Sequence, residues 1–73
     1  MLNKTQFTKK AAKAVRGARE KRGISQEELA HRAGLYRTYI GHIENGRYSP
    51  SAYVLYKIAK ALNTSVGELL NPL

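Results

Sequence analysis

The side chains that could do chemistry in this sequence are mostly cations and amides, and they form no catalytic or metal-binding pattern. The chain has no Cys and no Asp, and His31 and His42 are its two histidines. It also has no glycine-rich phosphate loop, so the usual nucleophile, acid–base and metal-ligand sets cannot be assembled. We therefore expect no enzyme activity, no cofactor and no metal, and we interpret His31 as an exposed helix residue.

Positive charge is what the chain has in excess, and it is concentrated near the N-terminus. The formal net charge is +8, from 13 Lys and Arg against 5 acidic residues. Residues 1–22 carry +7 of this charge, residues 23–47 are neutral and residues 48–73 carry +1. So basic a small chain favours a polyanionic partner, which is either nucleic acid or an anionic membrane surface.

The membrane alternative is weak. A basic amphipathic helix over residues 8–22 could lie on a membrane, but its apolar stripe is mostly Ala. No apolar run approaches the ~18 residues that span a bilayer, and the N-terminus lacks the apolar segment of a secretory signal. We therefore expect a cytoplasmic, nucleoid-associated protein without a membrane partner.

Single glycines, prolines and capping residues divide the 73 residues into five short helices, and no segment alternates like a strand. The predicted fold is a compact all-α domain covering residues 1–73, with a basic N-terminal arm at residues 1–7. The expected helices are Thr8 (as N-cap) to Arg22, Gln26–Ala33, Tyr36 or Arg37 to Asn45, a helix from Ser51 (as N-cap) to Leu62, and residues 66–70 before Pro72.

Helix ends carry the residues that favour them. Ser25 with Glu28, and Ser65 with Glu68, have the spacing of a capping box, and Gly23, Gly34 and Asn63 suit left-handed C-terminal positions. Apolar residues with helical spacing predict the core. They are Phe7, Ala11, Val15, Ala18, Leu29, Ala30, Ala33, Ile40, Ile43, Leu55, Ile58, Ala59, Leu62, Val66, Leu69 and Leu70.

The second and third helices, joined through Ala33-Gly34-Leu35, predict a helix-turn-helix over about residues 26–45. The second helix of such a motif can enter the ~12 Å major groove of DNA. From about Ala11 to Leu70 the chain also resembles the XRE-type helix-turn-helix family of lambdoid phage repressors. The resemblance rests on Ile24–Gly34, Tyr39-Ile40, Ile43–Gly46, Pro50-Ser51 and Ile58–Leu62, and Arg37–Ile40 is similar to restriction-modification controller proteins.

The predicted recognition helix has a buried side and a reading side. Ile40 and Ile43 fix the buried side, so Arg37, Thr38 and His42 are the candidates for reading bases. A guanidinium can bond both O6 and N7 of guanine, which makes Arg37 the strongest of the three. His42 either reaches a base edge or is a solvated surface residue.

The resemblance implies further contacts, to the DNA backbone. Glu44 is expected to pair with Arg19 and so orient Arg19 toward phosphate, and Tyr39 either contacts phosphate or simply buries its ring. The expected backbone residues are Gln26, Tyr39, Asn45, Arg47, Arg16 and Arg19. The sequence departs from the family pattern at Tyr36, which cannot cap a helix, at Gly41, and at Ala18.

The resemblance also implies a homodimer that binds double-stranded DNA at a pseudo-palindromic operator. A chain this short buries only ~60% of its unfolded surface, which favours a partner copy as well. The candidate interface residues are Tyr53, Tyr56, Leu69, Leu70 and Leu73. The alternative is a protein-interaction module, such as the antitoxin or adaptor half of a two-protein system, in which DNA binding is secondary.

Overall fold

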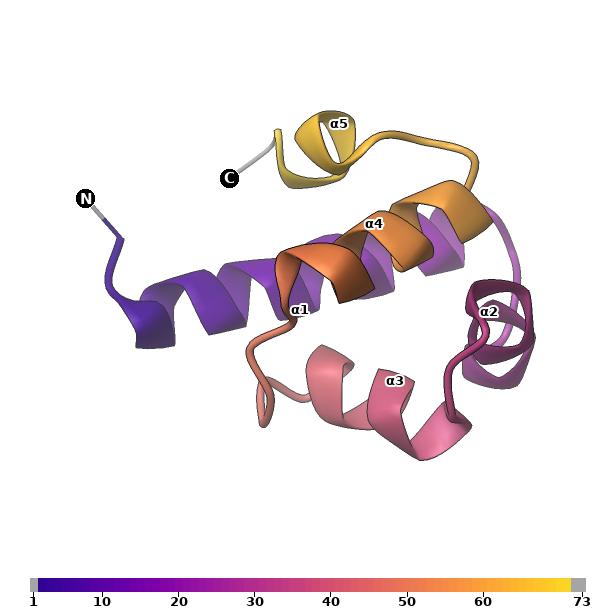
Figure 1. Cartoon of the computed structure of the whole chain (residues 1–73), viewed down its shortest axis with the longest axis horizontal. Coiled ribbons are helices and arrows are strands. Elements are labelled where there is room, and N and C mark those ends of the chain that lie inside the picture. The colour runs from indigo at the N-terminus through magenta and orange to yellow at the C-terminus, as the bar shows by residue number, and fades with distance from the viewer. Residues whose placement is uncertain (1, 72–73) are drawn as a thin grey trace.

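The computed structural model describes residues 2–71, and every regular element within them is a helix. The predicted all-α, five-helix fold is confirmed. None of the helices in this part of the chain is long and apolar enough to cross a bilayer. The helices follow one another with short connections (Figure 1) and are α1 Lys4–Lys21, α2 Gln26–Ala33, α3 Arg37–Glu44, α4 Ala52–Ala61 and α5 Val66–Leu70.

The serine caps form as expected. The hydroxyls of Ser25, Ser51 and Ser65 accept hydrogen bonds from the backbone N–H groups of Glu28, Val54 and Glu68, at 3.0, 3.2 and 3.0 Å. These bonds satisfy N–H groups that the first turn of a helix leaves without a partner. The reciprocal half of the Ser25–Glu28 box is not formed, because the Glu28 carboxylate accepts from Arg32 Nε at 2.7 Å instead.

The start of α1 corrects the prediction. The helix begins at Lys4 rather than after Thr8, so residues 4–7 are helical and do not form an arm. Asn3 and Gln6 make a complete capping box, in which Gln6 N–H donates to Asn3 Oδ1 at 2.8 Å and Asn3 N–H donates to Gln6 Oε1 at 3.1 Å. Thr8 lies inside the helix, and its hydroxyl donates to the Lys4 carbonyl at 2.7 Å.

The core lies where the apolar spacing placed it. α1 contacts α3 along one side and α5 along the other, while α2 packs against α3 and α4 (Figure 1). Val54, Ala12 and Thr8 are also buried, although the apolar pattern did not select them. The largest fully buried side chains are Val15, Leu29, Ile40, Ile43, Ile58 and Leu62.

The end of the chain corrects the set of candidate interface residues. Leu69 is only 5% exposed and belongs to the core of its own domain, so it is not available to a second copy. Leu70 is partly buried and packs against the same core. Leu73 lies outside the described residues, as does Pro72, which was expected to end α5. Tyr53 and Tyr56 remain as exposed side chains on α4.

The same substitution at two glycines is expected to change stability in opposite directions. Gly34 has a φ of 68°, which disfavours any Cβ, so Gly34→Ala should lower the free energy of unfolding by about 1 kcal/mol. Gly17 lies within α1, where an added Cβ meets nothing within 4 Å, so Gly17→Ala should raise the free energy of unfolding by about 0.5–1 kcal/mol. Urea unfolding followed by circular dichroism measures both changes. Changes of the same sign would contradict the prediction.

Candidate nucleic-acid interface

Helices α2 and α3 and the short turn between them form a helix-turn-helix at the predicted place. Gly34 closes α2 in the left-handed conformation and Tyr36 is the extended residue before α3. Tyr36 makes no side-chain cap, in keeping with its side chain, and its ring is 84% exposed. α3 starts at Arg37, so the tyrosine in the N-cap position does not displace the helix.

The first turn of α3 is open to solvent on one side and anchored on the other. Ile40 and Ile43 are fully buried, whereas Arg37 and Thr38 are exposed. Within residues 2–71 the Arg37 side chain has no hydrogen-bond or ion-pair partner. Its guanidinium is therefore available to a ligand.

The carboxylate of Glu44, the last residue of α3, is enclosed by donors from α1 and α2. Its side chain has no exposed surface. Arg19 donates from Nε to Oε2 at 2.8 Å and from Nη2 to Oε1 at 3.1 Å, and Gln26 donates from Nε2 to Oε1 at 3.0 Å. Arg16 Nε lies 3.6 Å from Oε1. One carboxylate thus joins the recognition helix to both other helices.

This enclosure decides the charge of Glu44. Burial raises the pKa of the Glu44 carboxyl, but hydrogen bonds from Arg19 and Gln26 and the charges of Arg19 and Arg16 outweigh it. The pKa of Glu44 is consequently lowered from its ordinary value. The hydrogen bond with Glu44 in turn raises the pKa of Arg19. The pair is ionised throughout the neutral pH range.

The same contacts change what two predicted backbone residues can do. Arg19 also donates from Nη1 to the Ile24 carbonyl at 2.8 Å, and its side chain is 13% exposed. All three of its guanidinium nitrogens have partners inside the domain, so Arg19 serves as a positioning residue rather than as a free phosphate contact. Gln26 is half-buried, with one amide hydrogen held by Glu44, whereas Arg16 is 48% exposed.

An aromatic cluster follows the recognition helix. The ring of Tyr48 lies 4.9 Å from the His42 ring and 5.7 Å from the Tyr39 ring, measured between centroids, and it is tilted against both. Both His42 and Tyr39 are half-buried. The imidazole of His42 is therefore not a freely solvated side chain, and its packing against Tyr48 limits how far it can reach from α3. Tyr48 lies in the loop after α3, where no periodic pattern marks it, and the sequence analysis did not select it.

A hollow of about 520 Å³ lies beside this cluster, between the start of α1 and the loop after α3. Arg47 and Tyr48 line it from the loop, and Lys4 and Lys9 line it from α1. The earlier start of α1 is what puts Lys4 on a helix at this position. Asn45 is exposed as the C-cap of α3. The predicted backbone residue Arg47 is therefore joined by two cations that the sequence analysis did not assign.

The exposed tyrosines of α4 each lie beside a lysine. Lys57 Nζ is 5.3 Å from the centroid of the Tyr53 ring, and Lys60 Nζ is 5.8 Å from that of Tyr56. The rings are 69% and 54% exposed. They form an apolar surface on α4 that this domain leaves uncovered.

An arrangement of this kind, with an exposed first turn of α3 held at a fixed angle to α1 and α2, defines a helix-turn-helix protein. The sequence pattern of the helix-turn-helix family HTH_3 matches residues 15–69. The control protein C.SmaI of Serratia marcescens is 48% identical over 59 residues, which are 81% of this chain and 70% of that protein. An uncharacterized HTH-type transcriptional regulator of Archaeoglobus fulgidus is 42% identical over 55 residues, which are 75% and 79% of the two chains.

Solved structures give the same result. The restriction-modification controller protein C.AhdI from Aeromonas hydrophila superposes with a TM-score of 0.82 at 37% identity, over 85% of this chain and 94% of that one. An HTH_3 family transcriptional regulator from Vibrio cholerae superposes with a TM-score of 0.92 at 28% identity. That match covers 96% of this chain and 39% of the Vibrio protein.

This chain belongs to the HTH_3 family, the XRE-type family that its sequence resembles. It is an HTH-type transcriptional regulator, similar to restriction-modification controller proteins, and not an enzyme. DNA binding is the activity that this family membership implies.

Acid is expected to weaken the fold through Glu44. Because the pKa of Glu44 is lower in the folded state than in the unfolded state, its contribution is complete above the unfolded pKa of ~4.3 and is lost as pH falls through the folded pKa. The free energy of unfolding should therefore fall as the pH drops below about 4.3. Glu44→Gln should cost about 3 kcal/mol at pH 7 and make that pH dependence shallower.

Glu28→Gln is the matched control. The hydrogen bond from Arg32 likewise lowers the pKa of Glu28, but both side chains of that pair are more than two-fifths exposed, so the effect should be much smaller. Urea unfolding measured at several pH values compares the three proteins. Equal losses in the two variants would show that the Glu44 contacts carry no special weight.

Proposed function

We propose that this chain binds double-stranded DNA sequence-specifically, with α3 in the major groove at each half of a pseudo-palindromic operator. The observation that carries the proposal is the exposed, unpaired Arg37 guanidinium in the first turn of α3, on a helix whose opposite side is buried. A guanidinium presented in this way can donate two hydrogen bonds to a guanine. Thr38, beside it, contacts a thymine methyl or a backbone oxygen.

His42 has a defined place in this proposal. It lies one turn after Thr38 on α3, and the Tyr48 ring packs against its imidazole. An imidazole at this position contacts a base edge near the end of the reading surface. Its half-buried state supports a smaller contribution to discrimination than that of Arg37.

Phosphate contacts surround the reading surface in this proposal. Gln26 retains one amide hydrogen, and Arg16 retains an exposed guanidinium, for the strand beside the start of α2. Arg47 and the lysines of the hollow are suited to the phosphates at the other end of α3, since backbone contacts commonly use such side chains. The proposed backbone residues are Gln26, Arg16, Tyr39, Asn45, Arg47, Lys4 and Lys9.

A homodimer completes the proposal. One recognition helix reads only a few base pairs, and two-fold dimers read half-sites ~34 Å apart. Tyr53 and Tyr56 are the residues we assign to the contact between copies, because their rings are the large apolar surfaces that α4 leaves exposed. Leu70, which is partly buried against the core, remains a candidate for the same contact.

Selection from random duplexes, followed by binding measurements on the selected site, tests the function. We expect the selected site to be a pseudo-palindrome, and log K against log[salt] to have a slope of about −5 if about six phosphates are neutralised per dimer. Arg37→Ala should relax discrimination at one base of each half-site by about 1–3 kcal/mol. The control Arg47→Ala, at a proposed backbone contact, should weaken binding equally to all base variants. Equal affinity for the selected site and a scrambled duplex would overturn the proposal.

The dimer is tested separately, by sedimentation equilibrium. Tyr53→Ala combined with Tyr56→Ala should weaken self-association at least tenfold, because exposed aromatic rings at an interface carry much of its binding energy. The melting temperature of the monomer should change little, since both rings are exposed. The control is Tyr36→Ala, whose ring is 84% exposed but lies beside α3. An unchanged dimer in the double variant would place the interface elsewhere.

A further inference from the structure

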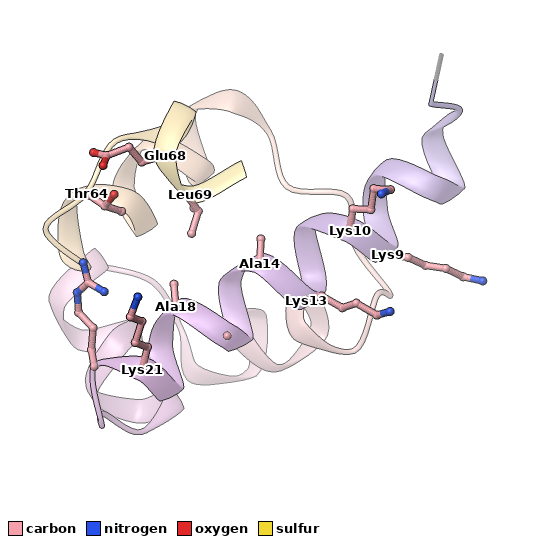
Figure 2. A pocket seen from close by; sticks show the side chains of 11 residues that line it. Lys9, Lys10, Lys13, Ala14, Ala18, Lys21, Thr64, Glu68 and Leu69 are labelled. Atoms are coloured by element: carbon pink, nitrogen blue, oxygen red, sulfur yellow. The ribbon is translucent and has the colours of Figure 1, made fainter. Parts of the chain in front are cut away.

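A groove of about 740 Å³ lies between α1 and α5. Its floor is small and apolar. Ala14, Gly17 and Ala18 line the floor from α1. Figure 2 shows Ala14 and Ala18 on this helix, with the side chain of Leu69, which is only 5% exposed, on α5. α3 lies on the other side of α1, so the floor of the groove faces away from the proposed DNA-reading surface (Figure 1), and Lys9 lines both the groove and the hollow beside α3.

The rim of this α1–α5 groove is strongly basic. Figure 2 shows Lys21 near one end of the floor and Lys10 toward the other, with Ala14 and Ala18 between them. Among the described residues, Glu68 is the single acidic residue that lines the groove. The cations that line it are Lys9, Lys10, Lys13, Lys21 and Arg22.

Gly17 leaves the middle of the floor open. A glycine inside a helix is unfavourable compared with alanine. The fold does not require it, because an added Cβ at Gly17 meets nothing within 4 Å and the backbone is ordinary helix. The missing side chain leaves the backbone of α1 open to a close approach at this point.

We propose that the α1–α5 groove binds an acidic amphipathic helix of a partner protein. The apolar face of such a helix fits the Ala and Gly floor, and its flanking carboxylates meet the cations of the rim. A second copy of this chain is a poor occupant, because none of the described helices carries more than two carboxylates. Nucleic acid would use the cations but has no apolar face for the floor.

The size of the groove sets the probe. Lys9 and Arg22 are thirteen residues apart on α1 and its C-cap, which corresponds to about 20 Å of helix. The probe is a fluorescein-labelled peptide of about 14 residues with Leu at helical spacing and Glu on both flanks. Fluorescence anisotropy with the full chain should show saturable binding that weakens with salt. A matched peptide with Lys in place of Glu should not bind.

Two pairs of variants locate the binding. Because an added Cβ at Gly17 meets nothing within 4 Å, we expect Gly17→Leu to fold and to fill the floor, so it should weaken peptide binding at least tenfold. Gly17→Ala, with a much smaller side chain, should retain most of the peptide binding. Lys21→Glu reverses a charge of the rim and should weaken binding at least fivefold. The control Lys57→Glu changes the same charge on α4, outside the groove, and should leave peptide binding unchanged. Thermal melting confirms that each variant is folded.

The remaining outcomes overturn the proposal and identify the true occupant. Equal binding of the peptide by the wild-type chain and Gly17→Leu would exclude the groove as its site. Loss of self-association in Gly17→Leu would identify a second copy, and weaker binding of random-sequence duplex by Gly17→Leu would identify nucleic acid. The proposal goes beyond the DNA-binding function and is independent of it, because Gly17→Leu should retain wild-type operator affinity while Arg37→Ala should retain peptide binding.

Discussion

The geometry of the helix-turn-helix depends on one buried carboxylate. Glu44 ends the recognition helix with no exposed side-chain surface, and α1 and α2 reach it through Arg19 and Gln26. A buried ion pair is often worth little net stability compared with an apolar replacement, but removing one partner leaves an unpaired charge that is costly. The contacts therefore matter chiefly because they allow few orientations of the three helices. The apolar contacts of Ile40 and Ile43 hold α3 in place, and Glu44 restricts how it can rotate there.

The same constraint separates two kinds of cation in a chain of net charge +8. Arg19 is used inside the domain, with every guanidinium nitrogen bonded, and it helps to fix the position of α3. Arg37 has no internal partner in the part of the chain that the structure describes, so it keeps its donors for a ligand. The neutral middle segment thus carries the proposed reading residue, while most of the excess charge lies on α1. In the proposal, discrimination between base pairs is assigned to α3, and general attraction to the DNA phosphates is assigned to the cations of α1.

The sequence predicted the features that depend on local chemistry. Ser25, Ser51 and Ser65 cap helices because a hydroxyl satisfies free N–H groups, and Ile40 and Ile43 are buried because of their spacing. Features that depend on tertiary neighbours were not predictable in this way. The Tyr48 ring meets His42 only once the loop after α3 has folded back. The start of α1 could have been found, since Asn3 and Gln6 have the capping-box spacing that was recognised elsewhere.

Leu69 shows why a surplus of apolar residues is an uncertain guide to an interface. Its spacing on α5 suits either the core or a partner, and the small side chain of Ala18 on α1 leaves room for Leu69 to turn inward. Small residues along α1 therefore have two consequences. They let the short α5 bury Leu69 against the domain, and they leave beside it a groove that the domain does not fill. The first consequence completes a core that is small for a chain of this length, and the second leaves a basic, apolar-floored surface on the side of α1 that α3 does not use.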